Sequence, residues 1–189
     1  RHNSVFSLQT VLLIARQLIN VLQHLHDCDF VHRDVKPENF LMGKEHTAPV
    51  VYLIDMGLVK RFRHNNSHIV RRQNKPLVGT VRYASLDTHR GIEQSRKDDM
   101  ESLGYMFVYL LKGSLPWQDV GADSIAEKYD KIHRIKETTT LEELCTGLPD
   151  AFCSYLQLCR NTQFHERPDY IRMRQLFSEL ADQHGFCCS

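Results

Sequence analysis

The sequence predicts a mainly α-helical domain with a few short β-strands and one long irregular segment. Apolar residues recur at helical spacing in several stretches, and capping or breaking residues flank these stretches. Other apolar runs are only two to five residues long, which is too brief for a helix and suits the strands of hairpins. A chain of 189 residues can bury one sizeable core, so we expect a single domain over residues 1–189.

The expected helices begin near the start of the chain. Residues 7–26 carry eight apolar side chains at helical spacing, and Ser7 can cap the first turn. Pro149 and Pro168 each suit the first position of a helix, whereas Gly113 can end one. The remaining helices are expected at 99–111, 123–135, 149–160 and 168–181.

The expected strands lie between the first two helices. Apolar runs at 30–31, 40–42 and 50–54 are the candidates, and the linker 43–49 suits a turn between the last two. Residues 55–97 are basic, polar and nearly without periodicity, so we expect a loop of about forty residues there. A compact domain keeps a loop of that length mainly for function.

The composition bears on the kinds of partner. The 24 Lys and Arg residues nearly balance the 23 Asp and Glu residues, so the charge gives no argument for nucleic acid or a membrane surface. We expect no nucleic-acid partner, and no transmembrane segment, because the apolar runs fall far short of roughly 20 residues. The six cysteines form no CxxC pair or zinc spacing, which predicts reduced cysteines in a cytoplasmic or nuclear protein.

The densest chemical signal is the run His32–Asn39, which reads HRDVKPEN, followed sixteen residues later by Asp55 of a DMG turn. Phosphoryl transfer from ATP needs a carboxylate that orients the attacking hydroxyl, a cation near the moving phosphoryl group, and hard oxygen ligands for Mg²⁺. Asp34 can supply the first and Lys36 the second, while Asn39 and Asp55 can hold the metal. This register is typical of a kinase catalytic loop and its metal-binding turn.

The chain also resembles a known family along essentially its whole length. A lysine two residues after the catalytic aspartate, as Lys36 is here, is typical of serine/threonine kinases. The later motifs are similar to those of casein kinase 1, with tau-tubulin and vaccinia-related kinases as close cousins. These motifs are the segments Gly79–Ser85, Thr88–Asp99, Glu101–Tyr105, Gly113–Gln118 and Arg167–Tyr170. The resemblance implies a protein-kinase-like C-terminal lobe, mainly α, with short β-hairpins and a long activation segment.

The resemblance implies ATP and Mg²⁺ as cofactors and assigns roles around the reacting groups. The hydroxyl of Thr80 is expected to brace Asp34 and Lys36. Leu41 is expected to form the floor of the adenine pocket, and Glu38 to lie near the ribose or the peptide substrate. The expected cofactor-binding residues are Glu38, Asn39, Leu41, Ile54 and Asp55.

Three further residues are expected to support the site. Asp99 matches a buried aspartate that accepts hydrogen bonds from backbone N–H groups of the catalytic loop, which would satisfy its buried charge. His32 and Met56 match positions that pack beneath that loop. Met56 replaces a phenylalanine that is usual at this position, and an adaptable apolar side chain should retain the function.

A basic pocket for substrates is also implied. Lys75, Arg82 and Lys128 match positions that surround an anion pocket in casein kinase 1, and charged donors that converge on one point bind phosphate well. The implied partners are protein substrates with an acidic or phosphorylated residue upstream of the target. Asp119 stands where the family has a glycine and should weaken anion binding. The alternative is three unrelated solvated charges.

An ion pair between Asp87 and Arg167 is a further expectation. Both residues depart from the casein kinase 1 pattern, which has an asparagine and a lysine at these places, and they depart in a complementary way. An arginine can meet a carboxylate with two hydrogen bonds. The pair would tie the end of the activation segment to the helical base, whereas the alternative is two separate surface charges.

The expected activity is transfer of the γ-phosphoryl group of ATP to Ser or Thr hydroxyls of proteins. Residues 1–31, which come before the catalytic loop, contain no glycine-rich phosphate loop and no strand lysine. We therefore expect the N-terminal kinase lobe to be a missing partner and the isolated chain to be inactive, with an exposed apolar patch around Leu41 and Ile54. A pseudokinase scaffold or an interaction module is the alternative.

Overall fold

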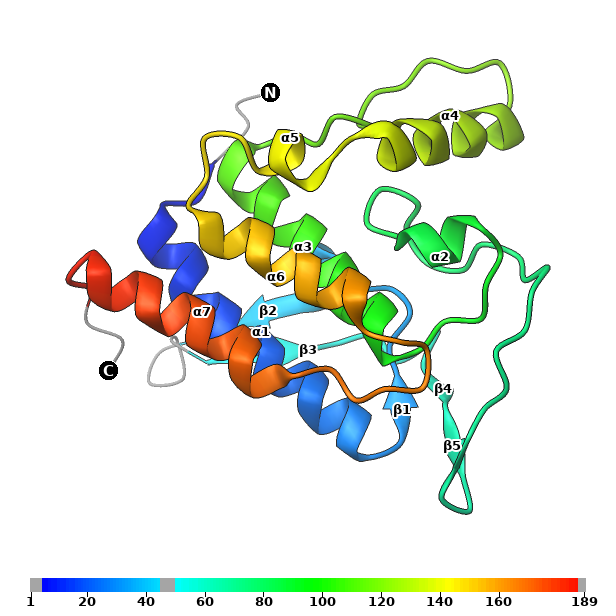
Figure 1. Ribbon diagram of the computed structural model, residues 1–189, viewed down its shortest axis with the longest axis horizontal. Helices are drawn as coiled ribbons and strands as arrows, with labels where there is room; N and C mark the ends of the chain where they lie inside the picture. The colour runs from blue at the N-terminus through cyan, green and yellow to red at the C-terminus, as the bar shows by residue number, and fades with distance from the viewer. Residues whose placement is uncertain (1–4, 45–49, 187–189) are drawn as a thin grey trace.

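The computed structural model describes residues 5–44 and 50–186, which form seven α-helices and six short strands (Figure 1). The helices are α1 Leu8–Asp27, α2 Leu86–His89, α3 Arg96–Lys112, α4 Ile125–Thr138, α5 Leu141–Cys145, α6 Asp150–Asn161 and α7 Tyr170–Gln183. The strands are β1 Phe30–Val31, β2 Phe40–Met42, β3 Val51–Leu53, β4 Lys60–Arg61, β5 Arg63–His64 and β6 Ser67–His68. A single 3-10 turn, η1, covers Pro37–Asn39. The mainly α fold with short hairpins that the sequence predicts is confirmed.

Helix α3 forms the centre of the fold, and 14 of its 17 residues are buried. It packs against α1 and α6, and α7 in turn contacts both of these helices. A Cβ atom at Gly104 would overlap the side chain of Leu156, so the glycine allows α6 to approach α3 closely. The ring of Phe107 lies within 5.3–6.5 Å of three aromatic rings, measured between centroids, on α6 and α7. This core holds the base on which the loops of the site rest.

The predicted helices are present, with small shifts at their ends. Ser7 caps α1, and its hydroxyl accepts a hydrogen bond from the backbone N–H of Thr10 at 3.1 Å. Helix α3 begins three residues earlier than predicted because Ser95 and Asp98 form a capping box. Helix α7 begins at Tyr170 rather than at a proline because the side chain of Asp169 caps it.

Helix α5 was not predicted. It has only five residues, which is too short for a periodic apolar pattern. Its local signal is the capping box of Thr140 and Glu143, in which each side chain accepts a hydrogen bond from the backbone N–H of the other residue.

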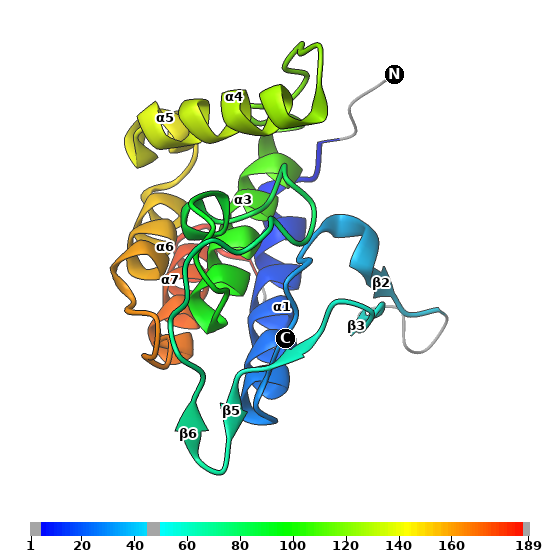
Figure 2. The same cartoon turned by 90° about the vertical axis from the view of Figure 1, so that its right-hand side faces the viewer.

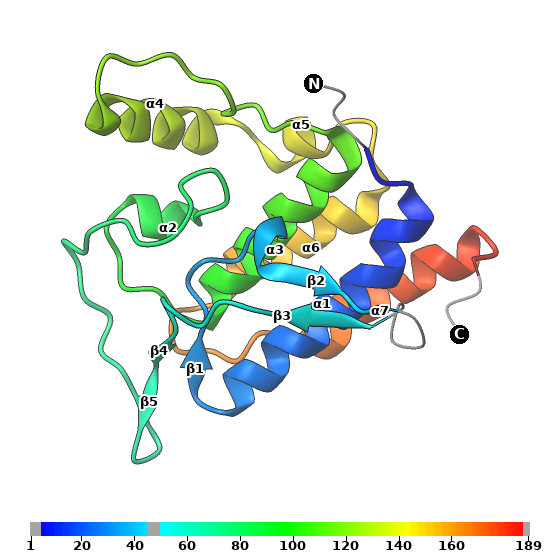
Figure 3. The same cartoon turned by 180° about the vertical axis from the view of Figure 1, so that it is seen from behind.

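The predicted hairpin of the second and third strands is confirmed. Strands β2 and β3 are antiparallel, with Phe40 opposite Leu53 and Met42 opposite Val51. The linker that the sequence predicts as a turn lies largely outside the described residues, since 45–49 are not described. Figure 3 shows this hairpin lying across α1 on one face of the helical core.

The long segment 55–97 is more ordered than the loop predicted from its composition. Strand β4 pairs with β1, and β5 pairs with β6 around Asn65 and Asn66, whose positive φ angles of 48° and 65° suit a tight hairpin turn. The one-turn helix α2 packs against α4. Figure 2 shows the β5–β6 hairpin at one end of the molecule, opposite α4 and α5. No helix in the described ranges is long and apolar enough to cross a membrane.

Candidate catalytic site

The loop 32–39 is fixed by a buried carboxylate in the first turn of α3. Asp99 is 1% exposed and accepts hydrogen bonds from the backbone N–H groups of His32 at 2.7 Å and Arg33 at 2.8 Å. A third hydrogen bond, of 2.9 Å, joins it to Nε2 of His26, whose Nδ1 lies 2.7 Å from the hydroxyl oxygen of Tyr170. The two bonds from the loop are those that the resemblance implies for Asp99, and together with the His26 contact they satisfy its buried carboxylate.

Sequence reasoning missed His26 in this network. It lies near the end of α1 at a position that fits the buried face of that helix, so its spacing is that of an ordinary core residue. The combination of a histidine among apolar residues and an aspartate three residues into α3 gives no local signal. Only the packing of α1 on α3 brings the two side chains together.

The carboxylate of Asp34 is held from both sides. Its Oδ1 accepts hydrogen bonds from the backbone N–H of Thr80 at 2.8 Å and from the Thr80 hydroxyl at 2.7 Å. Its Oδ2 lies 2.6 Å from Nζ of Lys36. Burial raises the pKa of Asp34, but the hydrogen bonds from Lys36 and Thr80 outweigh burial and hold the pKa below its ordinary value. Asp34 is therefore an oriented, ionised carboxylate at neutral pH.

Lys36 is the only cation paired with Asp34 within the described part of the chain. Its hydrogen bond with Asp34 raises the pKa of Lys36, and the negative charges of Glu38 and Asp55 raise it further. The ammonium thus stays charged within a small acidic group. Glu38 itself is exposed.

The β2–β3 hairpin brings Asn39 and Asp55 together. The backbone N–H of Ile54 donates to the carbonyl of Asn39 at 2.9 Å, so Asp55 directly follows a residue that is bonded to Asn39. The amide Nδ2 of Asn39 donates to the Asp34 carbonyl at 2.8 Å, which leaves its Oδ1 as a possible ligand. Asp55 has a positive φ of 61°, and its Oδ1 accepts from the backbone N–H of Gly57 at 3.0 Å.

This donor set fits Mg²⁺ with a nucleotide. No cluster of three His, Cys, Asp or Glu side chains that could hold a metal ion occurs among the described residues. Mg²⁺ is commonly bound by one or two carboxylates together with substrate phosphates and water, and an amide oxygen beside one carboxylate suits that arrangement. Asn39 and Asp55 would hold the ion, and phosphate oxygens would complete its shell.

An exposed apolar patch adjoins these residues, as predicted from the sequence. Leu41 is 53% exposed and Ile54 is 36% exposed. The other large exposed apolar side chains on the β2–β3 hairpin and the turn after it are Met42, Val50, Tyr52, Met56 and Leu58. A patch of this kind marks a surface that contacts a ligand or another part of a protein.

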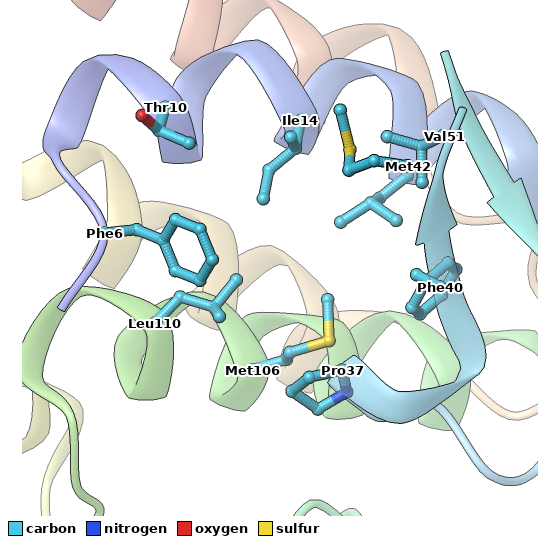
Figure 4. Close-up of a pocket in the computed structure, with 10 residues that line it drawn as sticks. Phe6, Thr10, Ile14, Pro37, Phe40, Met42, Val51, Met106 and Leu110 are labelled. Carbon is cyan, nitrogen blue, oxygen red and sulfur yellow. The ribbon is translucent and has the colours of Figure 1, made fainter. Parts of the chain in front are cut away.

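A cavity of about 190 Å³ opens beside this hairpin (Figure 4). Its walls come from α1, α3 and β2, and Figure 4 shows the side chains of Met106 and Leu110 facing those of Phe6 and Ile14. The lining is almost entirely apolar. The cavity therefore extends the apolar surface away from the carboxylates rather than forming a second polar site.

Met56 departs from its predicted place. It was expected to pack beneath the catalytic loop, but it is 51% exposed, because no described element covers this side of the Asp55–Gly57 turn. His32 is buried as predicted, and its Nδ1 accepts a hydrogen bond from the backbone N–H of Asp34 at 3.3 Å.

The three basic residues expected to share an anion pocket have different surroundings. Nζ of Lys75 lies 3.4 Å from Glu93, which also binds Nζ of Lys60 at 2.8 Å. The guanidinium of Arg82 lies over the ring of Tyr109, 5.5 Å from its centroid. Lys128 is exposed on α4, and none of the interactions in the described ranges joins it to the other two. Lys75 is therefore already engaged by a carboxylate, which a substrate anion would have to displace.

The predicted ion pair between Asp87 and Arg167 is wrong. The guanidinium of Arg167 binds the carboxylate of Asp27 at the end of α1. Asp87 instead lies 2.7 Å from Nζ of Lys97 and 3.5 Å from Arg90. Lys97 is buried in the first turn of α3, and a buried ammonium needs a carboxylate partner more than an exposed guanidinium does. Asp87 thus ties the end of the long segment to α3 rather than to the loop before α7.

One comparison with known proteins bears on this geometry. Residues 1–178 match the family model of the protein kinase domain. The match covers far more than half of the chain and includes every residue of the site described above. The chain therefore belongs to the protein kinase domain family.

Proposed function

We propose that this protein is a serine/threonine kinase of casein kinase 1 type, which transfers the γ-phosphoryl group of ATP to Ser or Thr hydroxyls of protein substrates. Membership of the protein kinase family already implies phosphoryl transfer to proteins. The observation that carries the finer proposal is the pairing of Asp34 with both Lys36 and Thr80. Lys36 at this position is the feature that resembles serine/threonine kinases.

Asp34 orients the attacking hydroxyl in this proposal. The hydroxyl of a substrate Ser or Thr donates to Asp34, which accepts its proton as the oxygen–phosphorus bond forms, while the bond from the γ-phosphorus to the bridging oxygen breaks and ADP leaves. Thr80 holds Oδ1 of Asp34 through two hydrogen bonds, so the carboxylate does not need to reorient during the reaction. Lys36, 2.6 Å from Asp34, would stabilise the negative charge of the transferred group.

Asn39 and Asp55 would hold Mg²⁺ in this proposal. Bound Mg²⁺ supplies charge neutralisation at the phosphate oxygens of ATP. The part of these residues is to fix the place of the phosphates relative to Asp34, and the bond between Asn39 and the Asp34 carbonyl links the two positions directly.

The exposed patch of Leu41 and Ile54 is the proposed floor of the adenine site. It is apolar, it adjoins the metal-binding pair, and it is open on one side. We assign the covering surface to an N-terminal lobe, so the chain acts as part of a longer kinase domain. Substrates with an acidic or phosphorylated residue upstream of the target remain part of the proposal, with Arg82 and Lys128 as the available cations.

A transfer assay on the complete protein tests this function. The protein is incubated with Mg²⁺, γ-labelled ATP and dephosphorylated casein, and mass spectrometry locates the phosphate. We expect phosphoserine or phosphothreonine, and Asp34→Asn should reduce turnover by about 10²-fold or more. Asp130→Asn is the matched control, because Asp130 is exposed on α4 and pairs only with Arg134 among the described residues.

Three outcomes would contradict the proposal or part of it. The first is an absence of transfer by the wild-type protein, which would favour the scaffold alternative. The second is equal transfer by Asp34→Asn and Asp130→Asn, which would remove Asp34 from the reaction. The third is phosphate found on tyrosine, which would overturn the Ser/Thr specificity that we infer from Lys36.

A further inference from the structure

A fully buried lysine lies behind the segment that follows Thr80. Lys136 is in the last turn of α4 and is 0% exposed. Its Nζ donates hydrogen bonds to the backbone carbonyls of Val81 at 3.0 Å and Ala84 at 2.6 Å. The ammonium also lies near two aromatic rings, 4.9 Å from the centroid of Trp117 and 5.0 Å from that of Tyr105.

No carboxylate forms an ion pair with Lys136 in the described part of the chain. The carboxylate whose charge acts on Lys136 is that of Glu101, whose Oε1 is 2.6 Å from the hydroxyl of Tyr105 and 3.7 Å from Nε of Arg160. Burial lowers the pKa of Lys136 well below its ordinary value, Glu101 raises it and Arg160 lowers it further. The two carbonyls and the two ring faces favour the charged form.

A buried lysine without an ion-pair partner is not the residue that stability alone would favour at this position. Burial of a charge without an ion-pair partner is costly, and apolar residues of similar size often serve a core equally well. A long apolar side chain on α4 would fill the same space. Among the described residues, the groups that accept hydrogen bonds from Nζ of Lys136 are the carbonyls of Val81 and Ala84, so the function of Lys136 should lie in their segment.

The segment 80–84 is held by its carbonyl groups. The carbonyl of Arg82 accepts from Nε1 of Trp117 at 2.7 Å, between the two carbonyls that Lys136 binds. The carbonyl of Thr80 accepts from the N–H groups of Tyr83 at 2.9 Å and Ala84 at 3.1 Å, which closes the segment into a turn. The first residue of this turn is the one that binds Asp34.

We propose that Lys136 is a positioning residue for the kinase reaction. It fixes the turn 80–84 through the carbonyls of Val81 and Ala84. It thereby determines the position of Thr80 relative to Asp34 and the shape of the surface that this turn offers to a protein substrate. The inference rests on the proposed function for its effect on catalysis. The hydrogen bonds that carry it do not depend on that function. Lys136 itself contacts neither substrate nor nucleotide in this assignment.

The histidines next to Lys136 do not substitute for it. His89 on α2 stacks on His133 of α4, with centroids 5.4 Å apart and planes 11° apart. Burial lowers the pKa of His89 to about 3, with Lys136 and His133 as further causes, so His89 is neutral. It hydrogen-bonds the backbone at Val81 but not at Ala84. Loss of Lys136 would therefore leave the carbonyl of Ala84 without its donor.

The test compares Lys136→Met with Lys112→Met in the complete protein. Lys112 is the matched control, because its Nζ also donates to a backbone carbonyl, that of Leu144 at 2.7 Å, in a partly buried place at the far end of α3. For Lys136→Met we expect kcat/KM for a peptide substrate to fall about tenfold or more, through both a lower kcat and a higher KM for the peptide, with the KM for ATP unchanged. Lys136→Arg, which keeps the charge and its donors, should recover part of the loss. Lys112→Met should leave these constants unchanged.

Hydrogen exchange gives a readout that does not need activity. The amides of Tyr83 and Ala84 should exchange about tenfold faster or more in Lys136→Met, because their turn is released, and at the wild-type rate in Lys112→Met. Wild-type KM and wild-type exchange in Lys136→Met would overturn the inference. If Lys136→Met does not fold, Lys136→Arg decides: a folded variant with unprotected Tyr83 and Ala84 amides would contradict the role given to the charge. An inactive wild-type protein would refute the proposed function, and the exchange comparison would still decide the role of Lys136.

Discussion

The catalytic loop 32–39 and the turn 80–84 are both irregular backbone, and each is held by one buried charge of opposite sign. Asp99 accepts hydrogen bonds from two backbone N–H groups of the loop, whereas Lys136 donates to two backbone carbonyls of the turn. Asp99 lies in the first turn of α3 and Lys136 in the last turn of α4, where the helix dipoles favour a negative and a positive charge respectively.

The two anchors differ in what balances their charge. Asp99 has His26 beside it as a third donor, while Lys136 has two aromatic rings and no ion-pair partner within the described residues. Both segments position Asp34. The loop 32–39 contains it, and the turn 80–84 contacts it through Thr80. The comparison indicates that a helical core can position a reactive carboxylate through charged side chains that do not contact it, here Asp99 on α3 and Lys136 on α4.

The largest expected effect comes from Asp99→Ala. The backbone N–H groups of His32 and Arg33 would lose a charged acceptor in a buried place, at a cost of about 3 kcal/mol or more in the free energy of unfolding. Phosphoryl transfer should fall at least as far as in Asp34→Asn, because the loop that carries Asp34 is released. Chemical denaturation and a transfer assay measure the two effects, and a stable variant with near wild-type turnover would break the comparison.

The ion pair between Asp87 and Lys97, which holds the end of the long segment 55–97, should contribute less to stability than Asp99 does. Asp87→Asn weakens the contact with the buried Lys97 and should lower the free energy of unfolding by about 2 kcal/mol, between the values for exposed and buried pairs. Arg167→Ala breaks the exposed pair with Asp27 and should cost at most about 1 kcal/mol. Chemical denaturation of both variants shows which of the two ion pairs contributes more to the free energy of unfolding. A larger loss for Arg167→Ala than for Asp87→Asn would contradict this prediction.

The smallest effect is expected from pH. The folded-state pKa of Asp34 lies below its ordinary value, so the stabilisation from its ionised form is present above that ordinary value and is lost as pH falls through the folded pKa. The folded-state pKa of Lys36 lies above its ordinary value, so its contribution is lost only as pH rises through that higher pKa. Between about pH 5 and about pH 9 the pair should give no inflection in kcat/KM. An inflection in that range that disappears in Asp34→Asn would contradict the assigned state of Asp34.

The helices and the residues around Asp34 could be predicted from the sequence because each is marked by a local pattern or by a single motif. Ser7 and its apolar stripe lie within one helix, and the run His32–Asn39 carries Asp34, Lys36 and Asn39 in one register. Thr80 and Asp99 are placed through the resemblance. These residues meet in the structure at hydrogen-bonding distance.

The contacts that sequence reasoning missed are long-range pairings without a local signature. Lys136 reads as an ordinary polar residue of α4, and its two carbonyl partners lie 52 and 55 positions away. Arg167 and Asp87 are complementary in charge, but which carboxylate meets which cation depends on how α1, α3 and the loop before α7 pack. Burial of Lys97, which decides the outcome, follows only from the three-dimensional packing of α3.

The measurement that tests most directly whether the turn 80–84 serves Asp34 through Thr80 is a double-mutant cycle on turnover with Thr80→Val and Asp34→Asn. Thr80→Val removes the hydroxyl that donates to Asp34 and keeps the backbone N–H, so turnover should fall about tenfold. Asp34→Asn should lower turnover by about 10²-fold or more. If Thr80 acts by positioning Asp34, the double variant should be no slower than Asp34→Asn alone, since the group to be positioned is already lost. Additive losses in the double variant would mean that Thr80 acts apart from Asp34.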